Sequence, residues 1–190
     1  MDFDAVVKAV VSAVVAFTVP KALNQFWPVE EEVESLPWLK WCMASAVGGL
    51  LGGSINLAVG VMGAGVGNWA ILGVSLGLFQ WLALRGYRNV GTWFILASTL
   101  GWMLFNLGGR IVSGVAVGIM QYLSLTQWRG AVWWIPANII AWPVAGRLGT
   151  RLGMSMGLDP GLSWLVAAVL TALVGSIILL FPLSRLAKKE

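Results

Sequence analysis

The sequence predicts an all-α protein, a polytopic membrane helix bundle of six or seven spans that contains a duplicated two-helix hairpin. Of its 190 residues, 58% are hydrophobic and 11% are charged, which leaves too few charges to cover a soluble domain. The charges separate apolar runs of roughly 17 to 25 residues, the length that crosses a bilayer. These runs are continuously apolar, whereas strands of a membrane barrel alternate polar and apolar residues. A motif unit of about forty residues also occurs twice.

The N-terminal region, residues 1–24, is predicted to hold an apolar helix. Its apolar part, residues 5–19, is short for a full span, so it either crosses the membrane or lies in the interface. An acidic loop follows at residues 25–37, which is either a solvated connection or a site for a cation or a partner.

The rest of the chain is predicted to form one integral membrane domain together with the N-terminal region, over residues 1–190. The first core span and its turn occupy residues 38–67, repeat 1 residues 73–109, repeat 2 residues 114–149, and the last span with a basic tail residues 160–190. Within these segments the expected spans are 38–61, 68–84, 91–107, 111–126, 131–145 and 162–183. Asp159 and Pro160 predict the start of the last helix, because Asp is a favoured N-cap and Pro suits the first helical turn.

The duplication is visible in the residues themselves. Repeat 1 reads Gly73-Val-x-x-Gly77-x-x-Gln80-Trp81-Leu82 and continues Trp93-x-x-x-Ala97-Ser98-x-x-Gly101-Trp102; repeat 2 reads Gly114-Val-x-x-Gly118-x-x-Gln121-Tyr122-Leu123 and continues Trp133-x-x-x-Ala137-Asn138-x-x-Ala141-Trp142. Each copy contains two spans, so both copies are expected to insert with the same orientation. A fragment of the pattern, Ala44-Ser45-x-x-Gly48-Gly49, hints at a third, partial unit.

Glycines at four-residue spacing predict close helix packing. In lipid, small residues at this spacing let helix backbones approach and gain dispersion contacts. The predicted helix-packing residues are Gly48, Gly52, Gly73, Gly77, Gly114 and Gly118.

Two sets of polar or aromatic side chains inside the spans are candidate ligand-binding residues. Gln80, Ser98, Gln121 and Asn138 are expected at one depth, either bonded between helices or facing a ligand or a water path. Trp102 and Trp142 occupy equivalent deep positions. They either line a pocket for a flat hydrophobic ligand (a lipid tail, quinone, carotenoid or chlorin) or pack with each indole N–H bonded.

Nine of the other tryptophans, among twelve in the chain, are predicted to form aromatic belts at the two membrane boundaries. Those placed at one boundary are Trp38, Trp41, Trp81, Trp93, Trp128, Trp133 and Trp134, with Trp69 and Trp164 at the opposite one.

The basic residues predict the orientation. Lys21, Lys40, Arg85, Arg88, Arg129, Arg185, Lys188 and Lys189 fall on one side of the spans, whereas Arg110, Arg147 and Arg151 fall on the other. The excess places the first side, and with it the C-terminus, in the cytoplasm. The three arginines of the far side either bind anionic headgroups or only extend to the interface.

Several kinds of chemistry are disfavoured. The chain has no histidine, which excludes metal or haem ligation by imidazole and histidine acid–base catalysis. No nucleophile–base pair or paired carboxylates are seen, so no catalytic residues and no metal site are predicted and an enzyme is not expected. The basic residues form no cluster with interleaved aromatics, so nucleic-acid binding is not expected.

The repeated Gly-x-x-x-Gly-x-x-Gln-Trp-x-x-Leu and Trp-x-x-x-Ala-Ser/Asn-x-x-Gly/Ala-Trp pattern resembles a group of uncharacterised bacterial Trp-rich multi-pass membrane proteins, many from phototrophs. The resemblance covers roughly residues 73–149, with Tyr122 in place of Trp and Ala141 in place of Gly. It implies a bacterial inner or photosynthetic membrane and carries no activity.

The expected function is that of a non-enzymatic integral membrane protein. It would be an accessory or structural subunit that packs against a partner membrane protein or its own copies, and holds membrane lipid or pigment. The alternative is a small permease or substrate-binding subunit with a polar site at the Gln80, Gln121 and Asn138 layer.

Overall fold

The computed structural model describes residues 38–59, 66–88 and 90–188, and this part of the chain is helical apart from one short strand pair. The predicted N-terminal helix and acidic loop lie outside the described residues. The helices are α2 (Trp38–Ala58), α3 (Val66–Arg88), α4 (Trp93–Met103), α5 (Phe105–Ser124), η1 (Ala131–Trp133), α6 (Trp134–Ser155) and α7 (Pro160–Ser184). The strands β1 (Trp128–Arg129) and β2 (Ala187–Lys188) pair antiparallel. The predicted all-α class is confirmed.

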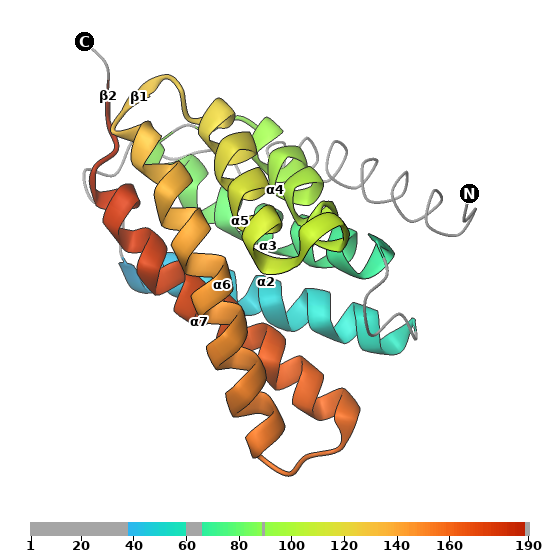
Figure 1. Cartoon of the computed structure of the whole chain (residues 1–190). Helices are drawn as coiled ribbons and strands as arrows, with labels where there is room; N and C mark the ends of the chain where they lie inside the picture. Colours follow the sequence, from blue (N-terminus) through green and yellow to red (C-terminus); the bar gives the residue numbers. More distant parts are fainter. Residues whose placement is uncertain (1–37, 60–65, 89, 189–190) are drawn as a thin grey trace.

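The six α-helices of the described residues pack in a closed ring. Each helix contacts the next along the chain, and α7 returns to pack against α2. Figure 1 shows α6 and α7 as one long antiparallel hairpin whose closed end extends beyond α3, α4 and α5. The chain therefore surrounds one core, which is lined by the inward faces of all six helices.

Three of the described helices are long and apolar enough to cross a membrane: α2, the Gly67–Arg85 part of α3, and α7. The α4 helix is also apolar but has only 11 residues. This agrees with the predicted membrane protein.

The α5 helix is broken near its start. Gly108 and Gly109 have non-helical backbone angles, and the positive φ of Gly109 (68°) is one that side chains with a Cβ rarely adopt. The regular part of α5 therefore begins at Arg110. The sequence placed a loop at residues 108–110, and the chain instead continues from a helical turn at Phe105 through this break.

The α6 helix ends at Ser155, ten residues beyond the predicted end of the span at residue 145. Glycines and arginines follow residue 145 in the sequence. The structure shows why the helix continues: a Cβ at Gly153 would lie 2.6 Å from the carbonyl oxygen of Ser163, so the glycine lets α6 lie directly on α7.

Asp159 caps α7 as predicted, with Pro160 as the first helical residue. Its Oδ1 atom accepts hydrogen bonds from the backbone N–H groups of Gly161 (2.9 Å) and Leu162 (3.1 Å). Replacing Asp159 with Ala should lower the free energy of unfolding by about 1 kcal/mol, whereas Asn should retain most of the cap. Thermal unfolding in detergent micelles measures both variants, and an equal loss in the two would contradict a capping role.

Candidate functional site

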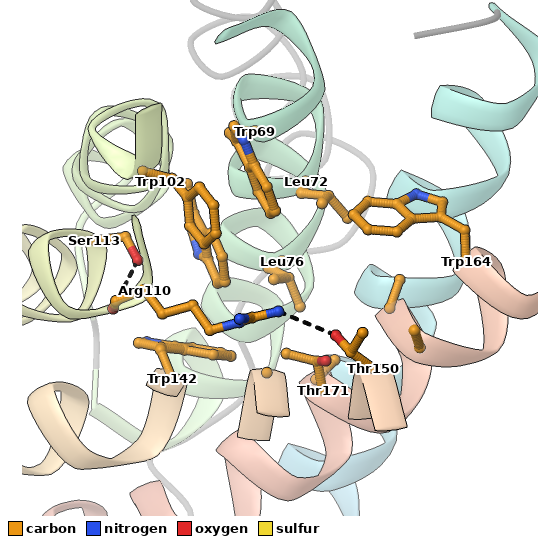
Figure 2. Close-up of a pocket in the computed structure, with 15 residues that line it drawn as sticks. Trp69, Leu72, Leu76, Trp102, Arg110, Ser113, Trp142, Thr150, Trp164 and Thr171 are labelled. Atoms are coloured by element: carbon orange, nitrogen blue, oxygen red, sulfur yellow. Dashed lines mark hydrogen bonds between the residues drawn. The ribbon is translucent and has the colours of Figure 1, made fainter. Parts of the chain in front are cut away.

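A pocket lies inside the ring, toward the end of the bundle where α3, α5 and α7 begin. It is partly open to the outside, and its cavity volume is about 60 Å³. Figure 2 shows its walls of indole rings and the arginine that extends across it. The residues of this tryptophan pocket are Trp69, Leu72, Leu76, Trp102, Phe105, Arg110, Ser113, Trp142, Gly146, Thr150, Trp164, Ala167, Ala168, Thr171 and Ala172.

The structure brings Trp102 and Trp142 together in this pocket. Their ring centroids are 4.9 Å apart at an interplanar angle of 67°, the edge-to-face arrangement that aromatic quadrupoles favour. Both rings are buried, and the indole N–H of Trp142 donates to the side-chain oxygen of Asn138 (2.6 Å). The sequence left open whether these two rings pack together or line a pocket, and in the structure they do both.

Trp69 and Trp164 belong to the same aromatic wall, which sequence reasoning missed. Trp69 stacks on Trp102 (5.9 Å, 10°) and on Phe105 (3.7 Å, 23°), and it meets Trp164 edge to face (6.1 Å, 72°). Their assignment to an outer aromatic belt was wrong, because Trp69 is buried and Trp164 is half-buried among other rings. Their positions near helix starts fit a belt equally well, and no local pattern distinguishes the two placements.

Among the described residues that line the pocket, Arg110 is the only ionisable one. It lies directly after the break in α5 and donates a hydrogen bond from its guanidinium to Oγ1 of Thr150 in α6 (3.1 Å). In the view of Figure 2, its side chain runs between Trp102 above and Trp142 below. The pocket therefore combines apolar aromatic walls with one cationic group.

The predicted amide layer is an internal hydrogen-bond network. Gln121 donates to Oγ of Ser98 (2.8 Å), and Ser98 in turn donates to the backbone carbonyl of Phe94 (2.8 Å). The Gln121 side-chain oxygen accepts from the indole N–H of Trp134 (2.6 Å). All of these side chains are buried, so these bonds satisfy polar groups that would be costly to leave unpaired.

The other two members of the predicted layer bond elsewhere. Asn138 donates to the backbone carbonyl of Trp134 (2.8 Å) and accepts from Trp142. Gln80 donates to Oγ of Ser45 in α2 (3.2 Å). The four residues therefore do not all bond to one another, and none of them lines the tryptophan pocket.

The six predicted packing glycines lie where helices touch. A Cβ at Gly73 would be 2.8 Å from the Cα of Thr99, and one at Gly114 would be 2.8 Å from the carbonyl oxygen of Asn138. The other four also face a neighbouring helix within 3.1 Å: Gly48 and Gly52 face α3, Gly77 faces α4, and Gly118 faces α6.

Only part of the larger predicted aromatic belt, the one with seven tryptophans, faces outward. Trp38, Trp93 and Trp133 are exposed, as a headgroup anchor requires. Trp41, Trp81, Trp128 and Trp134 are buried in the core instead. Two of these donate to backbone carbonyls, Trp41 to Ser176 (3.0 Å) and Trp81 to Val90 (2.7 Å). The buried four were misassigned because proximity to a helix end does not reveal which face of the helix a residue occupies.

Comparison with known proteins found no matching family model, no similar curated protein and no similar solved structure.

Proposed function

We propose that this chain is a non-enzymatic, multi-pass integral membrane protein that binds a membrane lipid in its tryptophan pocket and serves as an accessory or structural subunit. The observation that carries the proposal is the pocket itself, with four indole rings and Phe105 around its cavity. Concave sites lined by aromatic and aliphatic side chains with few polar groups are typical of binding sites for hydrophobic molecules.

Within the bundle of six spans that we propose, the helix packing supports a repeated hairpin. Gly73 and Gly77 pack against Thr99 and Ser98, and the equivalent Gly114 and Gly118 pack against Ile139 and Asn138. The Gln80–Ser45 bond has the same donor and acceptor types as the Gln121–Ser98 bond, which extends the correspondence to α2. With the C-terminus in the cytoplasm of a bacterial inner or photosynthetic membrane, the pocket would lie in the outer half of the bilayer.

A binding role accounts for the site better than catalysis or transport does. Arg110 is the single ionisable group in the described part of the pocket wall, and the hydroxyl of Ser113 donates to a backbone carbonyl rather than to a base. A permease that used Gln80, Gln121 and Asn138 would need a cavity reaching them. Their side chains are instead buried, and bonded to Ser45, Ser98 and aromatic N–H groups.

The outer surface supports a subunit role in a membrane. Large apolar side chains are exposed along α2 and α6, the two helices that pack against α7. They are Leu39, Met43, Val47 and Leu50 on α2, and Ile140, Val144, Leu148 and Leu152 on α6. Surfaces of this kind face lipid or another membrane protein, either a partner or a second copy.

Filling the pocket should remove the bound lipid. Leu76 is a buried pocket residue, so we expect Leu76→Trp to occupy the cavity and to lower lipid occupancy by about tenfold or more. The control is Leu123→Trp, the same exchange on the exposed face of α5. Native mass spectrometry after mild extraction counts bound lipids on each variant, and thermal unfolding without added lipid checks the fold.

The same measurement tests the whole proposal. Wild-type particles that carry a stoichiometric lipid, lost in Leu76→Trp and kept in Leu123→Trp, would support it. Bare wild-type particles, or equal lipid occupancy in the two variants, would contradict it. An absorption spectrum of the same sample separates a colourless lipid from a carotenoid or chlorin, and co-purifying proteins identify a partner subunit.

A further inference from the structure

We propose that Arg110 recognises an anionic oxygen group on the bound molecule, so that the tryptophan pocket takes an anionic amphiphile such as an acidic phospholipid. This inference rests on the proposed lipid-binding function and names the chemical class of the ligand. Arg110 would bind the phosphate, carboxylate or sulfonate of the head, and the indole walls would pack against the apolar chain.

Glycines on two helices help to place the side chain of Arg110 in the pocket. The break at Gly108 and Gly109 ends immediately before Arg110, which places its side chain at the start of the regular α5 helix. On the facing helix, a Cβ at position 146 would lie 2.6 Å from Nε and 2.8 Å from Cδ of Arg110. The missing side chain of Gly146 therefore leaves space for Arg110. Its guanidinium reaches the hydroxyl of Thr150, as the dashed line in Figure 2 shows.

The guanidinium has no acidic partner in this part of the molecule. Asp159 is the only acidic residue among the described ranges 38–59, 66–88 and 90–188, and its carboxylate is engaged by the backbone at the start of α7. Arg110 donates to a neutral hydroxyl, although a guanidinium has five N–H donors. Arg110 is partly buried, and a partly buried cation is costly without a counter-charge, which an anionic ligand would supply.

The geometry favours an anion over a neutral polar head. A guanidinium donates two parallel hydrogen bonds to a carboxylate or phosphate, and such charge-assisted pairs are stronger than bonds to neutral groups. The hydroxyl-bearing side chains Ser113, Thr150 and Thr171 line the same pocket and add short polar groups beside the cation. The rest of the wall is apolar, which suits a molecule with one charged end and one hydrocarbon end.

Arg147 and Arg151 provide matched controls on the same helix that carries Gly146 and Thr150. Both are exposed and neither lines the pocket, so they carry the same charge near the same end of the bundle without facing the cavity. A general attraction of the basic surface for acidic membranes would depend on all three arginines. Recognition inside the pocket would depend on Arg110 alone.

The experiment measures binding of phosphatidylglycerol and phosphatidylcholine with identical acyl chains to the purified full chain, by native mass spectrometry and by thermal unfolding. The wild type should bind phosphatidylglycerol about tenfold or more tightly than phosphatidylcholine. Arg110→Gln should lose this preference and bind both lipids as the wild type binds phosphatidylcholine. Gly146→Ala should also lose the preference, since it displaces the guanidinium and keeps the charge. Arg147→Gln should retain it.

The outcomes separate this inference from the proposed function. Equal binding of the two lipids by the wild type would overturn the anion inference and leave lipid binding standing, whereas binding of neither lipid would overturn both. An Arg147→Gln variant that loses as much preference as Arg110→Gln would also overturn a pocket-specific role. Inorganic phosphate distinguishes the source of the anion: protection of the wild type by phosphate alone, absent in Arg110→Gln, would keep the anion site and assign it to a soluble ion.

Discussion

Gly101→Ala is expected to lower the free energy of unfolding by about 3 kcal/mol. A Cβ at this position would lie 2.6 Å from the Cα and 2.7 Å from the backbone N of Val117 in α5. These are backbone atoms of a neighbouring helix, so the clash is relieved only if α4 and α5 separate. Separation would cost dispersion contacts along the whole α4–α5 interface, which are the main attraction between helices in lipid.

Gly91→Ala is the matched control, because position 91 is exposed and a Cβ there would meet nothing within 4 Å. It should change the free energy of unfolding by less than about 0.5 kcal/mol. Unfolding of both variants in mixed detergent micelles, followed by circular dichroism, gives the comparison. Similar stabilities for the two alanine variants would show that the close approach at Gly101 does not hold the bundle together.

Gln121→Leu should be the second most damaging change, with a loss of roughly 2–4 kcal/mol in the free energy of unfolding. Leucine would leave the buried indole N–H of Trp134 without its acceptor and would remove the donor to Ser98. The cost of an unpaired polar group is high here because Trp134 and Gln121 are both buried. Lipid occupancy of the folded fraction should stay unchanged, since Gln121 does not line the pocket.

Gln127→Leu supplies the comparison for this prediction, because Gln127 is exposed beside β1 and its replacement should be nearly neutral. Measuring stability and ligand occupancy on the same preparations separates the two roles of the amide. A stable Gln121→Leu protein that has lost a bound solute or a transport activity would establish the permease reading and refute the structural one.

The helices could be predicted well because their signals are local. Continuous apolar runs gave the segments, and the Asp159–Pro160 pair marked the start of α7. The end of α6 could not be predicted, since its continuation past residue 145 depends on the fit of Gly149 and Gly153 against α7. Residue type alone does not reveal a partner helix that makes such a continuation favourable.

The candidate site was predictable only in part, for the same reason. The repeat identified Trp102 and Trp142 as an equivalent pair, and the structure places them 4.9 Å apart. Trp69, Trp164 and Arg110 carried no such internal correspondence. Their meeting depends on the order in which helices close the ring, and a periodic pattern within one helix contains no information about that order.

The pocket can be complete only after α7, the last helix to be synthesised, has packed against α2. The Gly49 and Gly53 face of α2 packs against Ala172 and Leu165 of α7, so this contact forms only after the ribosome has made the last helix. Trp164 and Thr171, which complete the pocket wall, belong to that same late helix. A chain made only as far as α6 lacks the part of the pocket wall that Trp164 and Thr171 supply, so we expect binding in the pocket only after α7 has packed against α2.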